Sequence, residues 1–234
     1  MHIYAVIIGT EILNGRREDK HFAFLRDALL EYGHELYASF VIKDDPALIE
    51  RIYIMIKNDP QSVMFSFGGA ANVFTNAPLQ RNEEFFRAIL EKFGDDAYPH
   101  RIHMADLPRG VTLLKNPINN MSGFALENRF FFMPGFPQMS HPMVEDVLKN
   151  ILGRQKTKYR LTLKAQTSEN ELIHLMQETP KEIELSSLPI LNGERKEVEL
   201  SLAGEDKNTI EKEFQKYTDF LEKQKIKYKI LKSK

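Results

Sequence analysis

A pair of glycines follows an apolar run that ends near residue 67. The run Ser62–Phe67 leads into Gly68 and Gly69, and then into Ala70 and Ala71. Such a run is typical of a buried strand, and glycines allow the following loop to approach a ligand closely. Backbone N–H groups in such a loop can hold an anion. We therefore expect a loop that binds a phosphate-bearing ligand, although paired glycines also form ordinary tight turns.

Carboxylates near two other expected strand ends could hold a divalent cation beside this ligand. Glu11 follows the apolar run 3–8, and Asp44 and Asp45 follow the run 35–42. Carboxylate oxygens are preferred ligands of Mg²⁺. Glu11 could equally hold a ribose hydroxyl or be an exposed loop acid. Because Pro46 comes next, the acidic pair also predicts the N-cap of a helix.

Other turn residues could line the same cleft, because each follows an expected strand. They are Gly9 and Thr10 after the first strand, Asn116 and Pro117 after a later one, and Gly135 and Pro137 after the run Phe130–Met133. Ordinary turn chemistry accounts for them equally well. The histidines, including His21, His103 and His141, lack a zinc-type spacing.

The composition is that of an ordinary globular protein, with 42% hydrophobic and 28% charged residues in 234. A net charge of −1 gives no electrostatic reason to expect binding to nucleic acid or to a membrane. The absence of cysteine excludes disulfides and thiolate metal sites. There is no apolar run of ~20 residues and no signal-peptide pattern at the start, so we expect a cytoplasmic protein.

Alternating strands and helices must position these residues. Strands are expected at 3–8, 35–42 and 62–67, with helices at 19–32 and 46–57 between them. This βαβαβ order predicts an α/β fold with a three-layer, mostly parallel sheet. A helix at 85–93, a strand at 110–114, a strand pair at 123–126 and 130–133, and a helix at 143–151 follow. Residues 95–109 lack periodicity, which predicts a surface loop with a short turn.

The polar segment 153–158 predicts a boundary between a domain at 1–153 and a second at 158–234. The second reads as strand, helix, two strands, helix and strand, with Asn192-Gly193 as the hairpin turn. This βαββαβ order predicts a small α+β, ferredoxin-like domain. Lysines alternating along 223–229 favour an edge strand, and no GXXG loop for RNA is present.

Several segments resemble one family. Gly9-Thr10-Glu11-Ile12-Leu13 with Gly15 resembles the GTELL-x-G opening of the molybdopterin-binding-like fold, and above all that of the N-terminal domain of the CinA family. Residues 67–76 align with the TGGLGPT-x-DD loop of that family, and 107–110, 116–117, 123–124 and 133–139 match its later motifs. The resemblance covers residues 1 to about 152. Residues 158–231 are similar to its small KH-type domain, and the resemblance does not extend to the C-terminal amidase domain of full-length CinA, so we do not expect the activity of that domain.

The resemblance implies a divalent-metal-dependent reaction, such as hydrolysis of an ADP-ribose-type pyrophosphate. Glu11 and Asp44 would then hold Mg²⁺ or another cation. It also implies a homo-oligomer, a dimer or trimer, and molybdopterin as a conceivable ligand. However, the two aspartates of the family's loop are replaced by Thr75 and Asn76, and its first-helix asparagine by His21.

Losing both acids weakens a metal site more than it weakens a backbone phosphate cradle. We therefore expect a nucleotide- or pterin-phosphate-binding protein with a degenerate catalytic loop. The alternative is an active pyrophosphatase.

Overall fold

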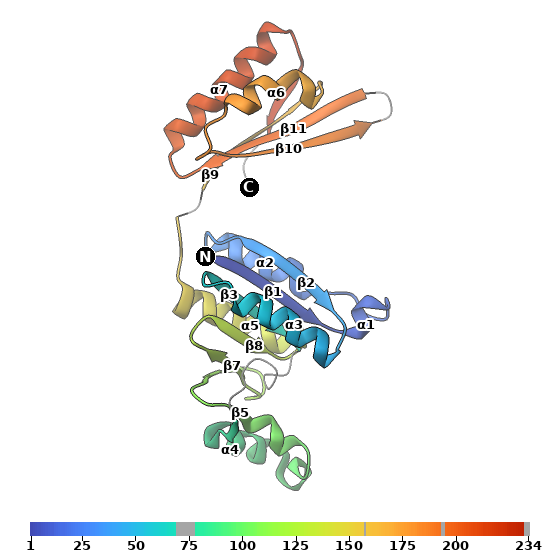
Figure 1. Ribbon diagram of the computed structural model, residues 1–234, viewed down its shortest axis with the longest axis vertical. Coiled ribbons are helices and arrows are strands. Elements are labelled where there is room, and N and C mark those ends of the chain that lie inside the picture. Colours follow the sequence, from blue (N-terminus) through green and yellow to red (C-terminus); the bar gives the residue numbers. More distant parts are fainter. Residues whose placement is uncertain (69–77, 157, 193–194, 232–234) are drawn as a thin grey trace. The chain divides into compact units, whose positions relative to one another are not determined.

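The computed structural model describes residues 1–68, 78–156, 158–192 and 195–231 (Figure 1). The chain divides into two compact units, Met1–Gln155 and Lys156–Lys234, which are described separately here. Gly69, Ala70, Ala71 and the Thr75-Asn76 pair lie outside the described residues, as does the turn at Gly193. No helix in the described part of the chain is long and apolar enough to cross a membrane.

The central sheet of the first unit has six described strands. In order across the sheet they are β2 (Leu36–Ile42), β1 (His2–Ile8), β3 (Ser62–Phe67), β8 (Phe130–Met133), β7 (Gly123–Leu126) and β6 (Thr112–Leu114). The first four are parallel to one another, while β7 pairs antiparallel with both β8 and β6. The prediction of a mostly parallel sheet is confirmed. The strand order reverses between β1 and β3, and ligands bind at such a switch point, beyond the carboxyl ends of the strands.

Helices cover both faces of this sheet (Figure 1). One face packs on α3 (Pro46–Lys57) and α4 (Glu83–Phe93), and the other on α2 (His21–Glu31) and α5 (Pro137–Val147). Alternate residues of β1 point into the two apolar layers, Tyr4 and Val6 into one and Ala5 and Ile7 into the other. This explains the continuous apolar run of β1, since a strand covered on both faces needs no polar side.

Side-chain caps set where the helices begin. The Asp45 carboxylate accepts the N–H of Leu48 (2.8 Å), and Pro46 occupies the first turn of α3. The Asp19 carboxylate accepts the N–H groups of His21 and Phe22 at the start of α2. The predicted cap before Pro46 is therefore confirmed, and it uses only the second aspartate of the pair.

The segment after α4 differs from the expected surface loop. It contains two 3₁₀ helices, η2 (Gly94–Ala97) and η3 (Arg101–Ala105), and a short strand, β5 (Asp106–Pro108). β5 pairs antiparallel with β4 (Leu79–Arg81), which the sequence did not indicate. The expectation was wrong because single turns and three-residue strands are too short to produce a hydrophobic period.

Two further boundaries also shift. β6 begins at Thr112 rather than at residue 110, because Gly110 has a φ of +81° and forms a turn. After α5 the chain continues through a π-helical turn, η4 (Leu148–Leu152), up to Gly153. A short helix, α1 (Thr10–Leu13), follows β1.

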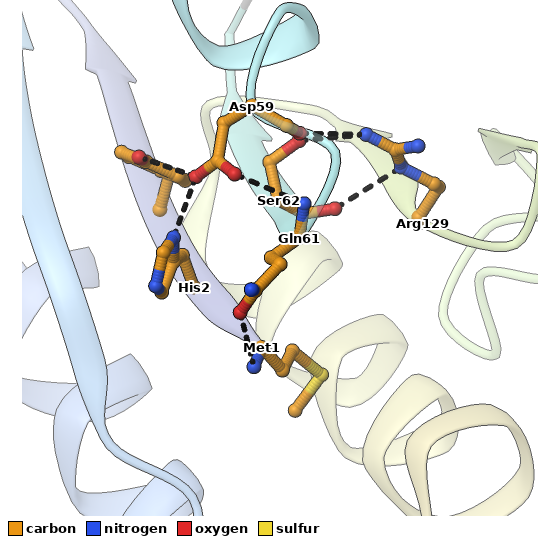
Figure 2. Close-up of polar contacts among 7 residues, drawn as sticks. Met1, His2, Asp59, Gln61, Ser62 and Arg129 are labelled. Carbon is orange, nitrogen blue, oxygen red and sulfur yellow. Dashed lines mark hydrogen bonds and ion pairs between the residues drawn. The ribbon is translucent and has the colours of Figure 1, made fainter.

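The amino ends of the parallel strands are joined by a polar network (Figure 2). Asp59 Oδ2 lies 2.7 Å from His2 Nδ1 and accepts the hydroxyl of Tyr4 (2.9 Å). Arg129 donates to the carbonyls of Ser62 and Asp59, both at 3.1 Å, and to the Ser62 hydroxyl at 2.8 Å. These contacts connect the starts of β1, β3 and β8. We call the end of the sheet where the parallel strands begin the amino edge, and the end where they finish the carboxyl edge.

The second unit contains β9 (Tyr159–Ala165), α6 (Glu169–Glu178), β10 (Glu184–Asn192), β11 (Arg195–Gly204), α7 (Lys207–Lys223) and β12 (Tyr228–Leu231). The order of elements is the predicted βαββαβ. Its antiparallel sheet has the order β10-β11-β9-β12, which places β12 at an edge as predicted. Of the alternating lysines only Lys229 lies in this strand, because Lys223 ends α7 and Lys225 lies in the following turn. Val198, Leu200 and Leu202 point into its core with the helices.

Candidate functional site

A cavity of about 470 Å³ lies at the carboxyl edge, beside the switch point between β1 and β3. It is built from the end of β1 and from the segments that follow β1, β2, β3 and β8. Its lining residues are Ile7, Ile8, Glu11, Ile12, Arg17, Glu18, Lys20, His21, Asp44, Gly68, Gly135, Phe136, Pro137 and Gln138. We call it the charged cavity, because it brings cationic and anionic side chains together.

Two glycines allow the ends of the strands to meet at this cavity. Gly68 has a φ of +86°, and a Cβ there would lie 3.0 Å from the carbonyl oxygen of Ile8. A Cβ on Gly135 would lie 3.4 Å from the Cα of Gly68. The Gly68 N–H also donates to the carbonyl of Met133 (2.9 Å), which ties β3 to the end of β8. A side chain at position 68 would therefore be both strained and crowded.

Arg17 and Lys20 supply positive charge to the cavity, and the start of α5 adds to it. The 11-residue helix α5 begins at Pro137, and the N-terminus of a helix carries a partial positive charge. Arg17 Nη1 lies 3.9 Å from Glu11 Oε1, and its guanidinium lies 5.7 Å from the centre of the Phe136 ring. Because the Arg17–Glu11 pair is long and exposed, it leaves the guanidinium able to bind an anion.

The aspartate pair before α3 has two separate positions. Asp45 caps the helix, whereas Asp44 lines the charged cavity. The Asp44 N–H donates to the hydroxyl of Thr10 (3.2 Å), which joins the loop after β2 to the start of α1. The structure thus separates the two roles that the sequence left open for this pair, a helix cap and a residue at the site.

His21 lies beneath the cavity and is only 4% exposed. Its ring stacks on Phe67, with the ring centres 4.4 Å apart, and its Nε2 lies 3.3 Å from the carbonyl oxygen of Gly135. A carbonyl oxygen only accepts, so Nε2 carries the proton and donates. The Nδ1 atom of His21 is buried without a partner among the described residues. His21 therefore holds the end of β3 and the loop after β8 in one arrangement.

A second imidazole contacts the first. The His141 ring lies edge-on to His21, with centres 5.5 Å apart, and stacks on Phe24 at 3.7 Å. Burial lowers the pKa of His141 to about 4, and the nearby His21 contributes to this. Burial also lowers the pKa of His21. Both rings are consequently neutral near pH 7.

The described residues do not assemble a metal site. Within the described ranges there is no group of three or more histidine, aspartate or glutamate side chains placed to hold an ion. Glu11, Glu18 and Asp44 line the same cavity, but they do not form such a group. Hard cations such as Mg²⁺ require several oxygen ligands, so this donor set does not fit one.

An apolar cleft of about 490 Å³ lies on the other side of the two glycines. Gly68, Gly135 and Phe136 line both this cleft and the charged cavity. The remaining lining is mainly hydrophobic and comprises Leu79, Phe85, His103, Met104, Asp106, Leu107, Ser122, Gly123, Phe124, Phe132, Met133 and Pro134. The two spaces therefore meet at the glycine pair.

The structure brings five of the predicted site residues together. Glu11, Asp44, Gly68, Gly135 and Pro137 line the charged cavity, as the shared-cleft hypothesis requires. Gly9 and Thr10 lie next to it at the start of α1 without lining it. The remaining glycine-loop residues, Gly69, Ala70 and Ala71, lie outside the described residues.

Asn116 and Pro117 do not line the charged cavity, which corrects the expectation for this pair. The Asn116 side chain is 1% exposed and bonds within its own turn, to Asn119 Oδ1 (2.6 Å) and to the Met121 carbonyl (3.2 Å). They follow β6, which is separated from β8 by β7. With strands ~4.8 Å apart, a strand end at this position lies too far to the side.

Sequence reasoning missed Arg17, Lys20 and Phe136, and it treated His21 as an ordinary histidine. A usable signal was present, because the first loop between a strand and a helix commonly binds phosphate in doubly wound folds. Arg17 and Lys20 lie in that loop, and the asparagine-to-histidine difference at His21 marked the position.

Comparison with known proteins identifies the first unit. The family model described as "Probable molybdopterin binding domain" matches residues 4–154, more than half of the chain. A CinA-like protein of Nostoc punctiforme is 26% identical over 167 residues, which are 64% of this chain and 40% of that protein. A protein of Pyrococcus furiosus is 25% identical over an alignment of 233 residues, and the match covers 88% of this chain and 92% of that protein.

A solved structure agrees. The crystal structure of the protein CinA from Thermoplasma acidophilum has a TM-score of 0.55 and 24% identity to this chain, and covers 63% of this chain and 98% of its own. It shows a common fold. The chain spans less than half the length of the Nostoc relative, so activities of that whole protein do not transfer directly. The match over residues 4–154 shows that the chain belongs to the molybdopterin-binding domain family, and the chain is similar to CinA-like proteins.

Proposed function

We propose that the first unit binds a small ligand through its phosphate group, in the charged cavity at the carboxyl edge. The observation that carries this proposal is the convergence of Arg17, Lys20, Gly68 and the N-terminus of α5 on one cavity. Guanidinium and ammonium groups bind phosphate through charge-assisted hydrogen bonds, and helix N-termini favour anions. His21 supports the proposal, because its unpartnered Nδ1 marks the cavity floor as a polar site rather than a purely packed one.

The carboxylates suggest what accompanies the phosphate. Glu11, Glu18 and Asp44 line the same cavity as the cations. Carboxylates repel phosphate, but they accept hydrogen bonds from hydroxyl and amine groups. A ligand with both a phosphate and donor groups, such as a nucleotide or a pterin phosphate, would match both kinds of side chain.

The proposed role is binding without metal-dependent hydrolysis. A hydrolase of this kind would need a cation on the pyrophosphate, and the described residues do not provide a suitable set of ligands. Pyrophosphatase activity is the second candidate, favoured by the presence of Glu11 and Asp44 in one cavity. Incubation with ADP-ribose and Mg²⁺ or Mn²⁺ separates the two candidates. Turnover that a Glu11→Ala substitution abolishes would overturn the binding-only proposal.

Binding itself is tested by calorimetric titration of the full chain with inorganic pyrophosphate. A variant carrying Arg17→Ala and Lys20→Ala should bind at least about tenfold more weakly, because it loses two charge-assisted contacts. Arg26→Ala is the matched control: Arg26 lies on α2, pairs with Asp27 and does not line the cavity. Equal affinities of all three proteins, or no binding by the wild type, would contradict the proposal.

A further inference from the structure

Phe136 is an exposed aromatic side chain at the boundary between the charged cavity and the apolar cleft. Its side chain is 56% exposed, although the positions just before it, Met133 and Pro134, are buried or half-buried. The exposed part of this aromatic surface gains nothing from burial in the described fold and would gain from contact with an apolar partner. Its position therefore suggests contact with something outside the described fold.

The backbone of Phe136 is held firmly in place. Its carbonyl accepts the N–H groups of Met139 (2.9 Å) and Ser140 (3.0 Å) and the Ser140 hydroxyl (3.1 Å). The preceding residue, Gly135, is held by His21 Nε2. An aromatic ring on an anchored backbone can bind a partner with little loss of conformational entropy.

The surroundings of Phe136 define the chemistry of that partner. On one side Arg17 lies 5.7 Å from the ring centre, with its guanidinium beside the charged cavity. On the other side lies the apolar cleft, whose lining includes Phe124 and Phe132. A ligand with its phosphate beside Arg17 would thus extend its remaining part past Phe136 toward an apolar surface. A planar ring suits this position, because aromatic rings stack with offset faces.

We propose that Phe136 is a stacking platform for a planar heteroaromatic ring on the ligand whose phosphate binds in the charged cavity. The inference rests on the proposed function and adds to it the residue that selects the ligand's ring. Gly68 and Gly135 line both spaces and approach each other closely, because a Cβ on Gly135 would lie only 3.4 Å from the Cα of Gly68. Phosphate alone would bind through Arg17 and Lys20, and the ring would add affinity through Phe136.

The test compares ligands that differ only by a ring. Ribose 5-phosphate, AMP and GMP are titrated into the full chain by calorimetry. We expect AMP or GMP to bind at least about fivefold more tightly than ribose 5-phosphate, as base–aromatic stacking typically provides. Phe136→Ala should reduce this ratio to about one while leaving the affinity for ribose 5-phosphate within about twofold. Phe136→Trp should retain the ratio.

Phe22→Ala is the matched control. Phe22 is also an exposed phenylalanine (40%), with the Arg26 guanidinium 5.8 Å from its ring centre, but it lines neither the charged cavity nor the apolar cleft. It should retain the full ratio of affinities.

If ribose 5-phosphate binds but the ring ratio is unchanged in Phe136→Ala, the stacking role is wrong while phosphate binding stands. If the wild type binds AMP and GMP no more tightly than ribose 5-phosphate, the stacking role is wrong as well. If neither ribose 5-phosphate nor pyrophosphate binds, the proposed function fails and the stacking role fails with it.

Discussion

The two edges of the central sheet contrast in how their polar groups are used. At the amino edge, Asp59, Ser62 and Arg129 satisfy one another and join three strands (Figure 2). At the carboxyl edge, the buried Nδ1 of His21 has no described partner, and His21 lines the charged cavity. A satisfied polar network stabilises a fold, whereas an unmet hydrogen bond in a cavity can be met by a ligand. The comparison favours a structural role for the amino edge and agrees with the binding proposed at the carboxyl edge.

Removing Arg129 should produce the largest effect on stability. Arg129→Ala deletes three hydrogen bonds from a guanidinium at the amino edge, so we expect a loss of about 2–3 kcal/mol in the unfolding free energy of the first unit. Hydrogen exchange of the β1 and β3 amides in urea measures this unit by itself. Arg87→Ala, whose described bond is to its own helix, should cost less than about 0.5 kcal/mol.

Pyrophosphate affinity should not change in Arg129→Ala. A loss of affinity comparable to that of the Arg17/Lys20 variant would show that the two edges are not independent.

Gly68→Ala should cost about 2 kcal/mol and also weaken pyrophosphate binding. The positive φ costs about 1–2 kcal/mol for an alanine, and the contact with the Ile8 carbonyl at 3.0 Å adds to it. Gly15→Ala is the control, because Gly15 has a similar φ of +74° and open space around it. Equal costs for both substitutions would mean that the close approach of β1 and β3 contributes nothing.

Mild acid should destabilise the carboxyl edge before the amino edge. The pKa of His141 falls from 6.5 to about 4 on folding, so the folded state favours the neutral ring. The contribution of the neutral His141 ring to the unfolding free energy is therefore complete above pH 6.5 and is lost as the pH falls toward 4. At the amino edge, bonds from His2 and from the Gln61 N–H lower the pKa of Asp59, so its contribution is lost only below the ordinary value of 3.8.

His141→Phe provides the test, since phenylalanine can keep the stacking on Phe24. Urea midpoints measured between pH 7 and 4.5 should fall less steeply in this variant than in the wild type. Identical slopes would remove His141 from the acid response.

The smallest expected effects are those of substituting the neighbouring aspartates, Asp44 and Asp45. Asp45→Ala should destabilise the first unit by about 1 kcal/mol through loss of the N-cap, with little effect on binding. Asp44→Ala should leave stability nearly unchanged but alter affinity for ribose 5-phosphate, because Asp44 lines the cavity. If Asp44→Ala lowers stability as much as Asp45→Ala does, the assignment of separate roles is wrong.

The sequence predicted the architecture because its signals are local and repeated. The apolar run of β1, the periodic stripes of the helices and Asp45-Pro46 each specify an element without distant information. The segment after α4 failed because η2, η3 and β5 are too short to show a period.

The site was less predictable. Glu11, Asp44 and Gly135 follow from the rule that ligands bind at the carboxyl ends of parallel strands. The prediction that Asn116 lines the cavity was wrong, because the position of β6 across the sheet depends on pairing between distant segments. Phe136 was not predicted, because only the structure shows that its side chain is exposed. The KH-type resemblance of the second unit, the divalent cation and the homo-oligomer stay predictions.

The start of α3 shows how such a site could change its specificity over evolution. Proline suits the first turn of a helix and disfavours a helical conformation at the residue before it, so Pro46 favours a helix start with Asp45 at the cap. The side chain at position 44 is therefore not needed to cap the helix. Substitutions at this position could change which ligands the cavity accepts while the protein stays folded. Selection could therefore alter ligand specificity there with little loss of stability.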